Sequence, residues 1–157
     1  MVLCQINKSQ KMPQRDAEAL TPYSEIYHND MKLLVIEDSL EVQQRLCQML
    51  ATIPRLSVAA TDSVAAGLEQ LHLTPPDVVI LDLQLSDGDG LQVLRIAKRE
   101  VPAVQVFVLT NHVFRRQLCL KEGADGFFDK SMEFGTLLNA VKTLAAKSPE
   151  QTSGHHG

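Results

Sequence analysis

Short apolar runs alternate with segments of helical periodicity along most of this sequence, and that alternation constrains the fold more than any other feature. The apolar runs lie at residues 32–36, 57–61, 77–83, 104–110 and 126–129. In the third run four apolar residues, 78 to 81, follow one another without a polar break. Such continuity is typical of a strand that is covered on both faces of a parallel sheet. We therefore expect each run to form a β-strand.

Between the runs, apolar residues recur at the spacing of one helix face, and Ser39 precedes the first such segment as a predicted N-cap. The predicted helices lie at about 40–53, from 64 to the residue before Pro75, and at about 91–96, 112–122 and 134–144. Strands and helices in strict alternation imply an α/β fold, with a five-stranded parallel sheet and helices on both faces. The crossover connections are expected to be right-handed.

Composition and periodicity divide the chain into one domain and two flanking segments. Residues 1–30 are polar, contain Pro13 and Pro22 and lack a sustained period, so we expect a flexible N-terminal extension. Residues 31–147 carry the alternating pattern and are expected to form the domain. Residues 148–157 show no apolar pattern and are expected to be a flexible C-terminal tail.

Several classes of protein are disfavoured by simple counts. No apolar run approaches the roughly 20 residues that a membrane span requires, and no signal-peptide core is present, so we expect a cytoplasmic protein without a membrane partner. A net charge of −4 argues against a nucleic-acid surface. The three cysteines, Cys4, Cys47 and Cys119, are odd in number and lack CxxC spacing, so the last two are expected to be core thiols rather than disulfide or zinc ligands.

Polar residues follow four of the five predicted strands. Glu37 and Asp38 follow the first, Asp82 the third, Thr110 ends the fourth, and Lys130 follows the fifth. In open parallel sheets ligands bind beyond the carboxyl ends of the strands, which lie along one edge. We therefore expect these side chains to face a common site.

This set of side chains is suited to phosphoryl transfer. Three nearby carboxylates repel one another unless a cation lies among them, and oxygen ligands at an open site suit Mg²⁺. With Mg²⁺ and Lys130 balancing the charge of a transferring phosphoryl group, Asp82 could act as the nucleophile and form an aspartyl phosphate. Taken singly, each residue fits a turn, a helix cap or a solvated surface position. The joint occurrence after successive strands is what favours a functional site.

Four segments in order resemble the response-regulator receiver domain of two-component systems, over residues of about 31–147. They are VIEDS, VVILDLQLSDGDGL, VLTNH and GADGFFDKS, and the last two resemble most the receivers of the nitrate-regulator branch. The resemblance implies a flavodoxin-like (βα)5 receiver fold. It also implies a signalling phosphoprotein rather than an enzyme with an external substrate.

By resemblance, Asp82 is the phosphoacceptor, and Glu37, Asp38, Asp82 and the backbone carbonyl of Gln84 hold Mg²⁺. Lys130 is expected to pair with the phosphoryl oxygens, and Thr110 to move toward them as a switch. The three further residues that the resemblance singles out are Gln84 and His112, at positions that tune the phosphoryl lifetime, and Phe127, at the position of an inward-swinging aromatic switch.

The sequence departs from the common receiver pattern at two positions, and two glycines have an expected conformational role. Phe127 stands where many members have Tyr, and Ser131 follows Lys130 where Pro and a cis peptide bond are more usual. Gly88 and Gly90 fit a tight loop after the third strand, where glycine adopts positive φ without strain.

The expected partners are a histidine kinase or phosphotransfer protein as donor and, downstream, a protein or second copy bound through the face of helix four, strand five and helix five. The tail after Lys147 is too short for an output domain, so we expect a stand-alone or phosphorelay regulator, or the receiver part of a longer DNA-binding regulator. Three less favoured functions are a pseudo-receiver that binds without phosphorylation, an aspartyl phosphatase and a flavin-binding domain. Gln84 lies where such phosphatases carry a second acid, and Glu37 and Asp38 would repel a flavin phosphate.

Overall fold

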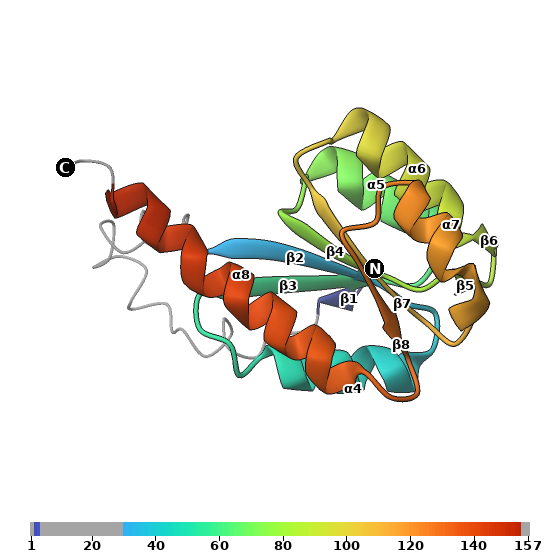
Figure 1. The fold of residues 1–157 in the computed structure, drawn as a ribbon, viewed down its shortest axis with the longest axis horizontal. Coiled ribbons are helices and arrows are strands. Elements are labelled where there is room, and N and C mark those ends of the chain that lie inside the picture. Colours follow the sequence, from blue (N-terminus) through green and yellow to red (C-terminus); the bar gives the residue numbers. More distant parts are fainter. Residues whose placement is uncertain (1, 4–29, 155–157) are drawn as a thin grey trace.

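The computed structural model describes residues 2–3 and 30–154, with side chains over 30–147. Its main strands are β1 (Val2–Leu3), β2 (Met31–Ile36), β3 (Leu56–Thr61), β4 (Val78–Leu81), β7 (Gln105–Thr110) and β8 (Gly126–Asp129). They form one sheet in the order β1-β3-β2-β4-β7-β8, shown in Figure 1. All neighbours from β3 to β8 pair in parallel, which confirms the predicted five-stranded parallel sheet.

Helices cover both faces of this sheet (Figure 1). They are α4 (Leu40–Leu50), α5 (Val64–Leu73), α6 (Gly90–Glu100), the 3₁₀ turn η1 (Val113–Arg115), α7 (Arg116–Lys121) and α8 (Phe134–Gly154). The α4 and α8 helices pack on one face, and α5, α6 and α7 on the other. The predicted alternation of strands and helices on two faces is confirmed.

The hydrophobic core has two layers because successive strand residues point to opposite faces of the sheet. On β2, Leu33 and Val35 pack under α4 and α8, whereas Leu34 and Ile36 pack under α5 and α6. The four residues of β4 are all buried, as the continuous apolar run predicted. Because β4 lies at the centre of the sheet between β2 and β7, the residue that follows it emerges at the middle of the functional edge.

Four details of the fold differ from the sequence-based expectation. Residues 2–3 pair antiparallel with β3, and the loop after β4 contains a small hairpin of β5 (Gln84–Leu85) and β6 (Gly88–Asp89). Two-residue strands leave no periodic signal in a sequence. The predicted helix at about 112–122 is divided into η1 and the short α7. The α8 helix continues to Gly154, past the expected end, although Pro149 lacks the N–H that a helix interior uses.

The two described cysteines are both buried but differ in their bonding. Cys119 is a free thiol with no exposed surface, as expected for a core position. Cys47 packs in the core as expected, but it is disulfide-bonded, which corrects the expectation of a plain thiol. Cys4, the remainder of the predicted N-terminal extension and residues 155–157 lie outside the described residues.

Candidate functional site

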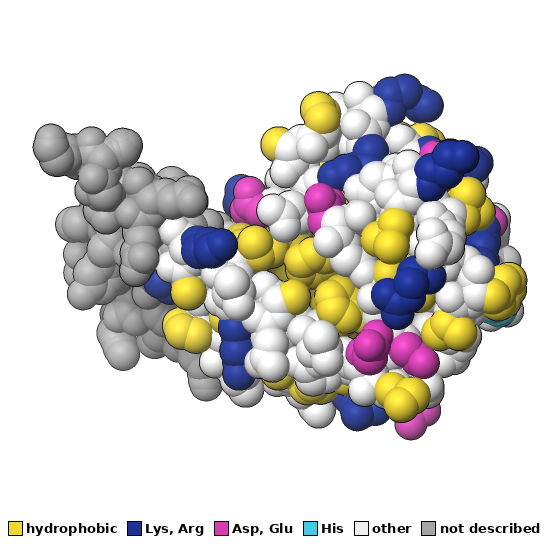
Figure 2. All heavy atoms as spheres, viewed as in Figure 1, with side chains coloured by type: hydrophobic (Ala, Val, Ile, Leu, Met, Phe, Trp, Pro, Cys, Tyr) yellow, Lys and Arg dark blue, Asp and Glu magenta, His cyan; other side chains and the backbone are white. Residues whose placement is uncertain are grey.

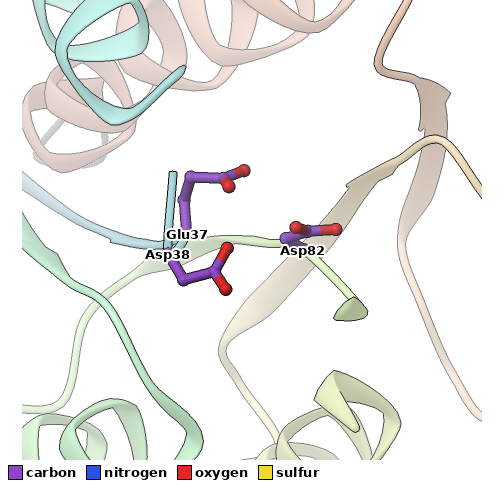
Figure 3. A group of neighbouring side chains, drawn as sticks. All are labelled: Glu37, Asp38 and Asp82. Atoms are coloured by element: carbon purple, nitrogen blue, oxygen red, sulfur yellow. The ribbon is translucent and has the colours of Figure 1, made fainter. Parts of the chain in front are cut away.

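Three carboxylates meet at the carboxyl edge of the sheet. Glu37 and Asp38 follow β2 directly, and Asp82 follows β4, the neighbouring strand. One oxygen atom from each of the three lies within 4.8 Å of the others, and Figure 3 shows the first two side chains reaching toward the third. Glu37 and Asp82 are buried, whereas Asp38 is exposed. The polar residues that were predicted to lie together because each follows a parallel strand are therefore brought together by the fold.

Lys130 joins this group from the far end of the sheet. It follows β8, and its Nζ lies 2.9 Å from Oε1 of Glu37 and 3.0 Å from Oδ2 of Asp82. Its backbone N–H donates to the carbonyl of Thr110 at 2.9 Å, so the lysine is held at the end of the β7–β8 pair. One ammonium group thus bridges two buried carboxylates on two other strands.

Burial and the neighbouring charges both shift pKa values in this cluster. Burial raises the pKa of Glu37 above its ordinary value, and the charge of Asp82 acts in the same direction, while the Ser39 N–H and Lys130 only partly offset them. Burial by itself would lower the pKa of Lys130, but its contacts with Glu37 and Asp82 outweigh that effect and raise it. Lys130 is therefore held in its charged form, whereas ionisation of Glu37 is less favourable than that of a carboxyl group in water.

The donor set fits a hard divalent cation. The cluster has three carboxylates, two of which contact the Lys130 ammonium group, so negative charge is uncompensated when all three are ionised. Their oxygen atoms are the ligand type that Mg²⁺ prefers, and because Asp38 is exposed the cluster is open to solvent on that side. The acidic cluster can therefore accommodate Mg²⁺ at the position expected from the sequence.

Thr110, Gln84 and His112 form a chain of contacts beside Asp82. The Thr110 side chain is fully buried, and its Oγ1 accepts from the His112 N–H at 3.2 Å. The His112 ring Nε2 lies 2.7 Å from Oε1 of Gln84. The Gln84 N–H in turn donates to Oδ1 of Asp82 at 3.3 Å. The three predicted peripheral residues thus connect the β7 end with the loop after β4.

Phe127 lies on the inner side of β8. Its ring is buried in the core layer under α6 and α7, so the position expected for an inward aromatic side chain is occupied. The Arg116 guanidinium lies over the ring at 4.9 Å from its centroid and donates to the Phe127 carbonyl at 3.4 Å. In the loop after β8, Ser131 donates to Oδ1 of Asp129 from both its N–H and its hydroxyl. No peptide bond of the described residues is cis, and this includes the bond between Lys130 and Ser131.

The two glycines of the loop after β4 have different roles. Gly88 has a φ of 159°, near extended backbone, while Gly90 does not have positive φ and begins α6. A Cβ at Gly90 would overlap the backbone carbonyl oxygen of Asp82 and lie 2.9 Å from Cα of Leu83. The expectation of positive φ at Gly90 is therefore wrong. Glycine is needed there because α6 starts against the backbone of the candidate acceptor.

Two aspartates that were not predicted from the sequence fix this loop. Asp87 accepts from the N–H groups of Val64 and Ala65 at 2.7 and 3.1 Å, and these bonds hold its pKa below the ordinary value. Asp89 caps α6 and pairs with both terminal nitrogens of Arg115 at 3.0 Å, and the Arg115 contact lowers its pKa. An Asp directly before a helix is a readable cap signal. The long-range contact of Asp87 has no such signal.

An open pocket lies between the β5–β6 hairpin and η1. It has a volume of about 470 Å³ and extends from Leu83 and Gln84 to Arg115. Leu85 contributes an apolar wall, and Phe114, which is 80% exposed, stands at its rim with its ring 5.6 Å from that of His112. The exposed end of the site is therefore partly apolar.

Comparison with known proteins agrees with this geometry. The response regulator receiver domain model matches residues 33–142. The DNA-binding transcriptional activator DevR/DosR of Mycobacterium tuberculosis is 28% identical over 74% of this chain and 55% of its own length. The nitrate/nitrite response regulator NarL of Escherichia coli is 30% identical over 73% of this chain and 54% of its own. The chain thus spans about half the length of these curated relatives.

Solved structures show the same fold. The signal receiver domain of a DNA-binding response regulator from Colwellia psychrerythraea superposes with a TM-score of 0.68 at 27% identity, covering 73% of this chain and 98% of the other. Among the helices that the structure describes, none has the length and hydropathy needed to cross a membrane. With the matched residues containing the whole acidic edge and Lys130, the chain belongs to the receiver domain family of two-component response regulators.

Proposed function

We propose that this receiver accepts a phosphoryl group on Asp82. The observation that carries the proposal is the placement of one carboxylate, at the end of the central strand, beside an acidic pair and a bridging lysine. An oxygen of Asp82 attacks phosphorus, the bond from phosphorus to the donor's imidazole nitrogen breaks, and a carboxyl–phosphate bond forms. The donor class is a histidine kinase or a phosphotransfer protein with a phosphorylated histidine.

Glu37, Asp38, Asp82 and the Gln84 carbonyl would hold Mg²⁺ in this proposal, which rests on the acidic cluster and the family. The ion supplies positive charge to the oxygens of the transferring group. Lys130 would also supply positive charge to these oxygens, because its ammonium lies 3.0 Å from Asp82 and can turn to a phosphoryl oxygen there. The buried surroundings of Asp82 strengthen both interactions.

Thr110 is the proposed switch residue. In the described structure its hydroxyl oxygen accepts from the His112 N–H, so its own proton is available to a new acceptor on Asp82. A phosphoryl group provides such an acceptor only in the phosphorylated state, and that difference shifts the population of the two states. Because His112 contacts both Thr110 and Gln84, and the Gln84 N–H donates to Asp82, movement of Thr110 should also alter the contacts beside Asp82. Gln84 and His112 are therefore the proposed determinants of phosphoryl lifetime.

The proposed output surface is formed by α7, β8 and α8. Phe127 and the Arg116 guanidinium that covers it connect the core to this surface. Basic side chains gather over α6 and α7 in Figure 2, with hydrophobic side chains between them and α8. Leu118 and Leu120 of α7 are exposed beside Lys121. We propose that a downstream protein or a second copy of this chain binds here.

The test is phosphorylation of purified protein by acetyl phosphate and MgCl₂, read by intact-protein mass spectrometry. Asp82→Asn should carry no added phosphoryl group. The matched control is Asp62→Asn, since Asp62 also follows a strand but is exposed and outside the acidic cluster. That variant should be labelled as the parent is. Full labelling of Asp82→Asn would contradict the proposal, and absence of labelling in the parent would favour a pseudo-receiver.

A second candidate is the receiver part of a longer DNA-binding regulator. The observation in its favour is that the chain spans 55% of a relative named as a DNA-binding transcriptional activator. An antibody raised against this chain should then detect a polypeptide about twice as long in extracts of the source cells. A band at the mass of this chain alone would count against that candidate.

A further inference from the structure

Gln43 is a buried amide in the first turn of α4. It is 4% exposed, whereas its neighbour Gln44 is exposed. Its backbone N–H donates to the carbonyl of Ser39, the N-cap residue, at 2.9 Å. Helical side chains point back toward the N-terminus of their helix. The amide of Gln43 is thereby directed at the carboxyl edge of the sheet, where the acidic cluster lies.

The Gln43 amide joins the ends of two strands. Its Nε2 donates to the carbonyl of Glu37 at 3.0 Å and to the carbonyl of Thr61 at 3.1 Å, and both bonds are buried. The Thr61 carbonyl also accepts from the Glu37 N–H at 3.1 Å, the bond that extends the β2–β3 ladder past Ile36. Gln43 thus supplies a side-chain link where the backbone pairing of β2 and β3 ends.

The Glu37 carbonyl belongs to the peptide group that leads into Asp38. Because a peptide group is planar, fixing its carbonyl also fixes the direction of the following N–Cα bond. Asp38 is exposed, so core packing does not hold its side chain in place. The direction in which the Asp38 carboxylate leaves the backbone therefore depends on a peptide plane that Gln43 restrains. The Glu37 side chain is separately held by the Ser39 N–H at 3.0 Å and by Lys130.

We propose that Gln43 is a positioning residue for the acidic pair: its amide fixes the Glu37–Asp38 peptide so that Asp38 converges with Glu37 and Asp82 on one divalent cation. The inference rests on the proposed Mg²⁺-dependent function. The two hydrogen bonds that the Gln43 amide donates go to backbone carbonyls, so it would act through the Glu37–Asp38 backbone and not as a ligand of the cation. Residues that orient metal ligands in this way commonly change metal affinity by 10–100-fold when they are replaced.

The test compares Gln43→Met with Gln44→Met. Methionine matches the length and helix propensity of glutamine but cannot donate a hydrogen bond, and the Gln44 variant controls for the change in the same helix. By calorimetric titration with MgCl₂, Gln43→Met should bind about tenfold more weakly than the parent, and Gln44→Met within about twofold of it. With acetyl phosphate, Gln43→Met should be labelled slowly at limiting Mg²⁺ and at the parental rate at saturating Mg²⁺.

The outcomes separate this inference from the proposed function. If the parent does not bind Mg²⁺, the proposed function fails. If the parent binds and a folded Gln43→Met binds equally well, the positioning role is overturned and the function stands. If Gln43→Met does not fold, the side-chain amide resonance of Gln43 is followed in the parent during the MgCl₂ titration. A shift that saturates with binding supports the role, and an unchanged resonance overturns it.

Discussion

Replacement of Lys130 by Met tests the electrostatic account of the site. Methionine keeps an unbranched side chain that is one atom shorter than that of lysine, and the change removes the charge and the hydrogen-bond donors. Lys130 contacts Glu37 at 2.9 Å and Asp82 at 3.0 Å, and the exposed fractions of the three side chains are 13%, 3% and 5%. The ammonium is therefore shielded from water and shared between two buried carboxylates, so its loss leaves both without their nearest positive charge.

The magnitude follows from burial. Removing one partner of a buried ion pair typically costs about 3–5 kcal/mol, because the other charge stays desolvated. Here Glu37 can take up a proton instead, since burial already raises its pKa and the lost contacts with Lys130 were among the factors that lowered it. We therefore expect a loss of about 3 kcal/mol at pH 8 in the absence of divalent ions. Such a loss is a large share of the roughly 5–15 kcal/mol of an ordinary domain.

The loss should depend on pH with a definite sign. A carboxyl whose native pKa lies above its unfolded value binds more protons in the native state, so stability falls as pH rises through the native pKa. Because the pKa of Glu37 should rise further in the variant, the difference from the parent should be smaller near pH 5 than at pH 8. Mg²⁺ should recover part of the loss at pH 8 because it binds the native carboxylates.

Urea unfolding followed by circular dichroism measures these differences, since the chain has no Trp for fluorescence. Lys142→Met is the matched control, because Lys142 is exposed on α8, and it should differ little from the parent at any pH. A Lys130→Met loss that is equal at pH 5 and pH 8, or unaffected by Mg²⁺, would refute the reasoning.

Three substitutions at two positions where α6 begins, Asp89 and Gly90, have separable effects, each measured by urea unfolding. Asp89→Asn keeps an oxygen to cap α6 but loses the charge that faces Arg115, and because Asp89 is 49% exposed the loss should be about 0.5 kcal/mol. Asp89→Ala loses the cap as well and should cost about 1.5 kcal/mol, so equal losses in the two variants would contradict this division. Gly90→Ala should cost about 2 kcal/mol in spite of the better helix propensity of alanine, and should slow phosphorylation, because the methyl group overlaps the Asp82 carbonyl. Unchanged stability and labelling would show that the loop relaxes freely.

The sequence predicts the sheet well because buried positions appear in it as a regular pattern of apolar residues. The fully buried β4 appears as a continuous apolar run, and the long α8 appears as a stripe. The β5–β6 hairpin and β1 are too short to show any period in the sequence. The division of 112–122 into η1 and α7 was not predicted because the pattern of apolar residues is the same for one helix as for two. The continuation of α8 past Pro149 could not be predicted, because proline is disfavoured in the interior of a helix.

The site is predicted for a different reason, namely topology. Parallel strands send their carboxyl ends to one edge, so Glu37, Asp38, Asp82 and Lys130 could be grouped without knowing any contact. The residues that hold the group in place could not be found in this way. Their bonds run from a side chain to a distant element: Gln43 to Thr61 across 18 residues, and Asp87 to Val64 across 23. Such contacts depend on side-chain direction after folding, which no period in the sequence records.

Because Lys130 contacts both Glu37 and Asp82, phosphorylation of Asp82 should change the surroundings of Glu37 as well. Before phosphorylation the ammonium divides its charge between Glu37 and Asp82. A phosphoryl group on Asp82 adds nearly two negative charges beside it. On the proposed function the ammonium then turns to the phosphoryl oxygens, and Glu37 loses the contact that helped to keep it ionised. Glu37 must then be protonated or rely on the divalent cation, so the phosphorylated state should depend more strongly on Mg²⁺ than the unphosphorylated one.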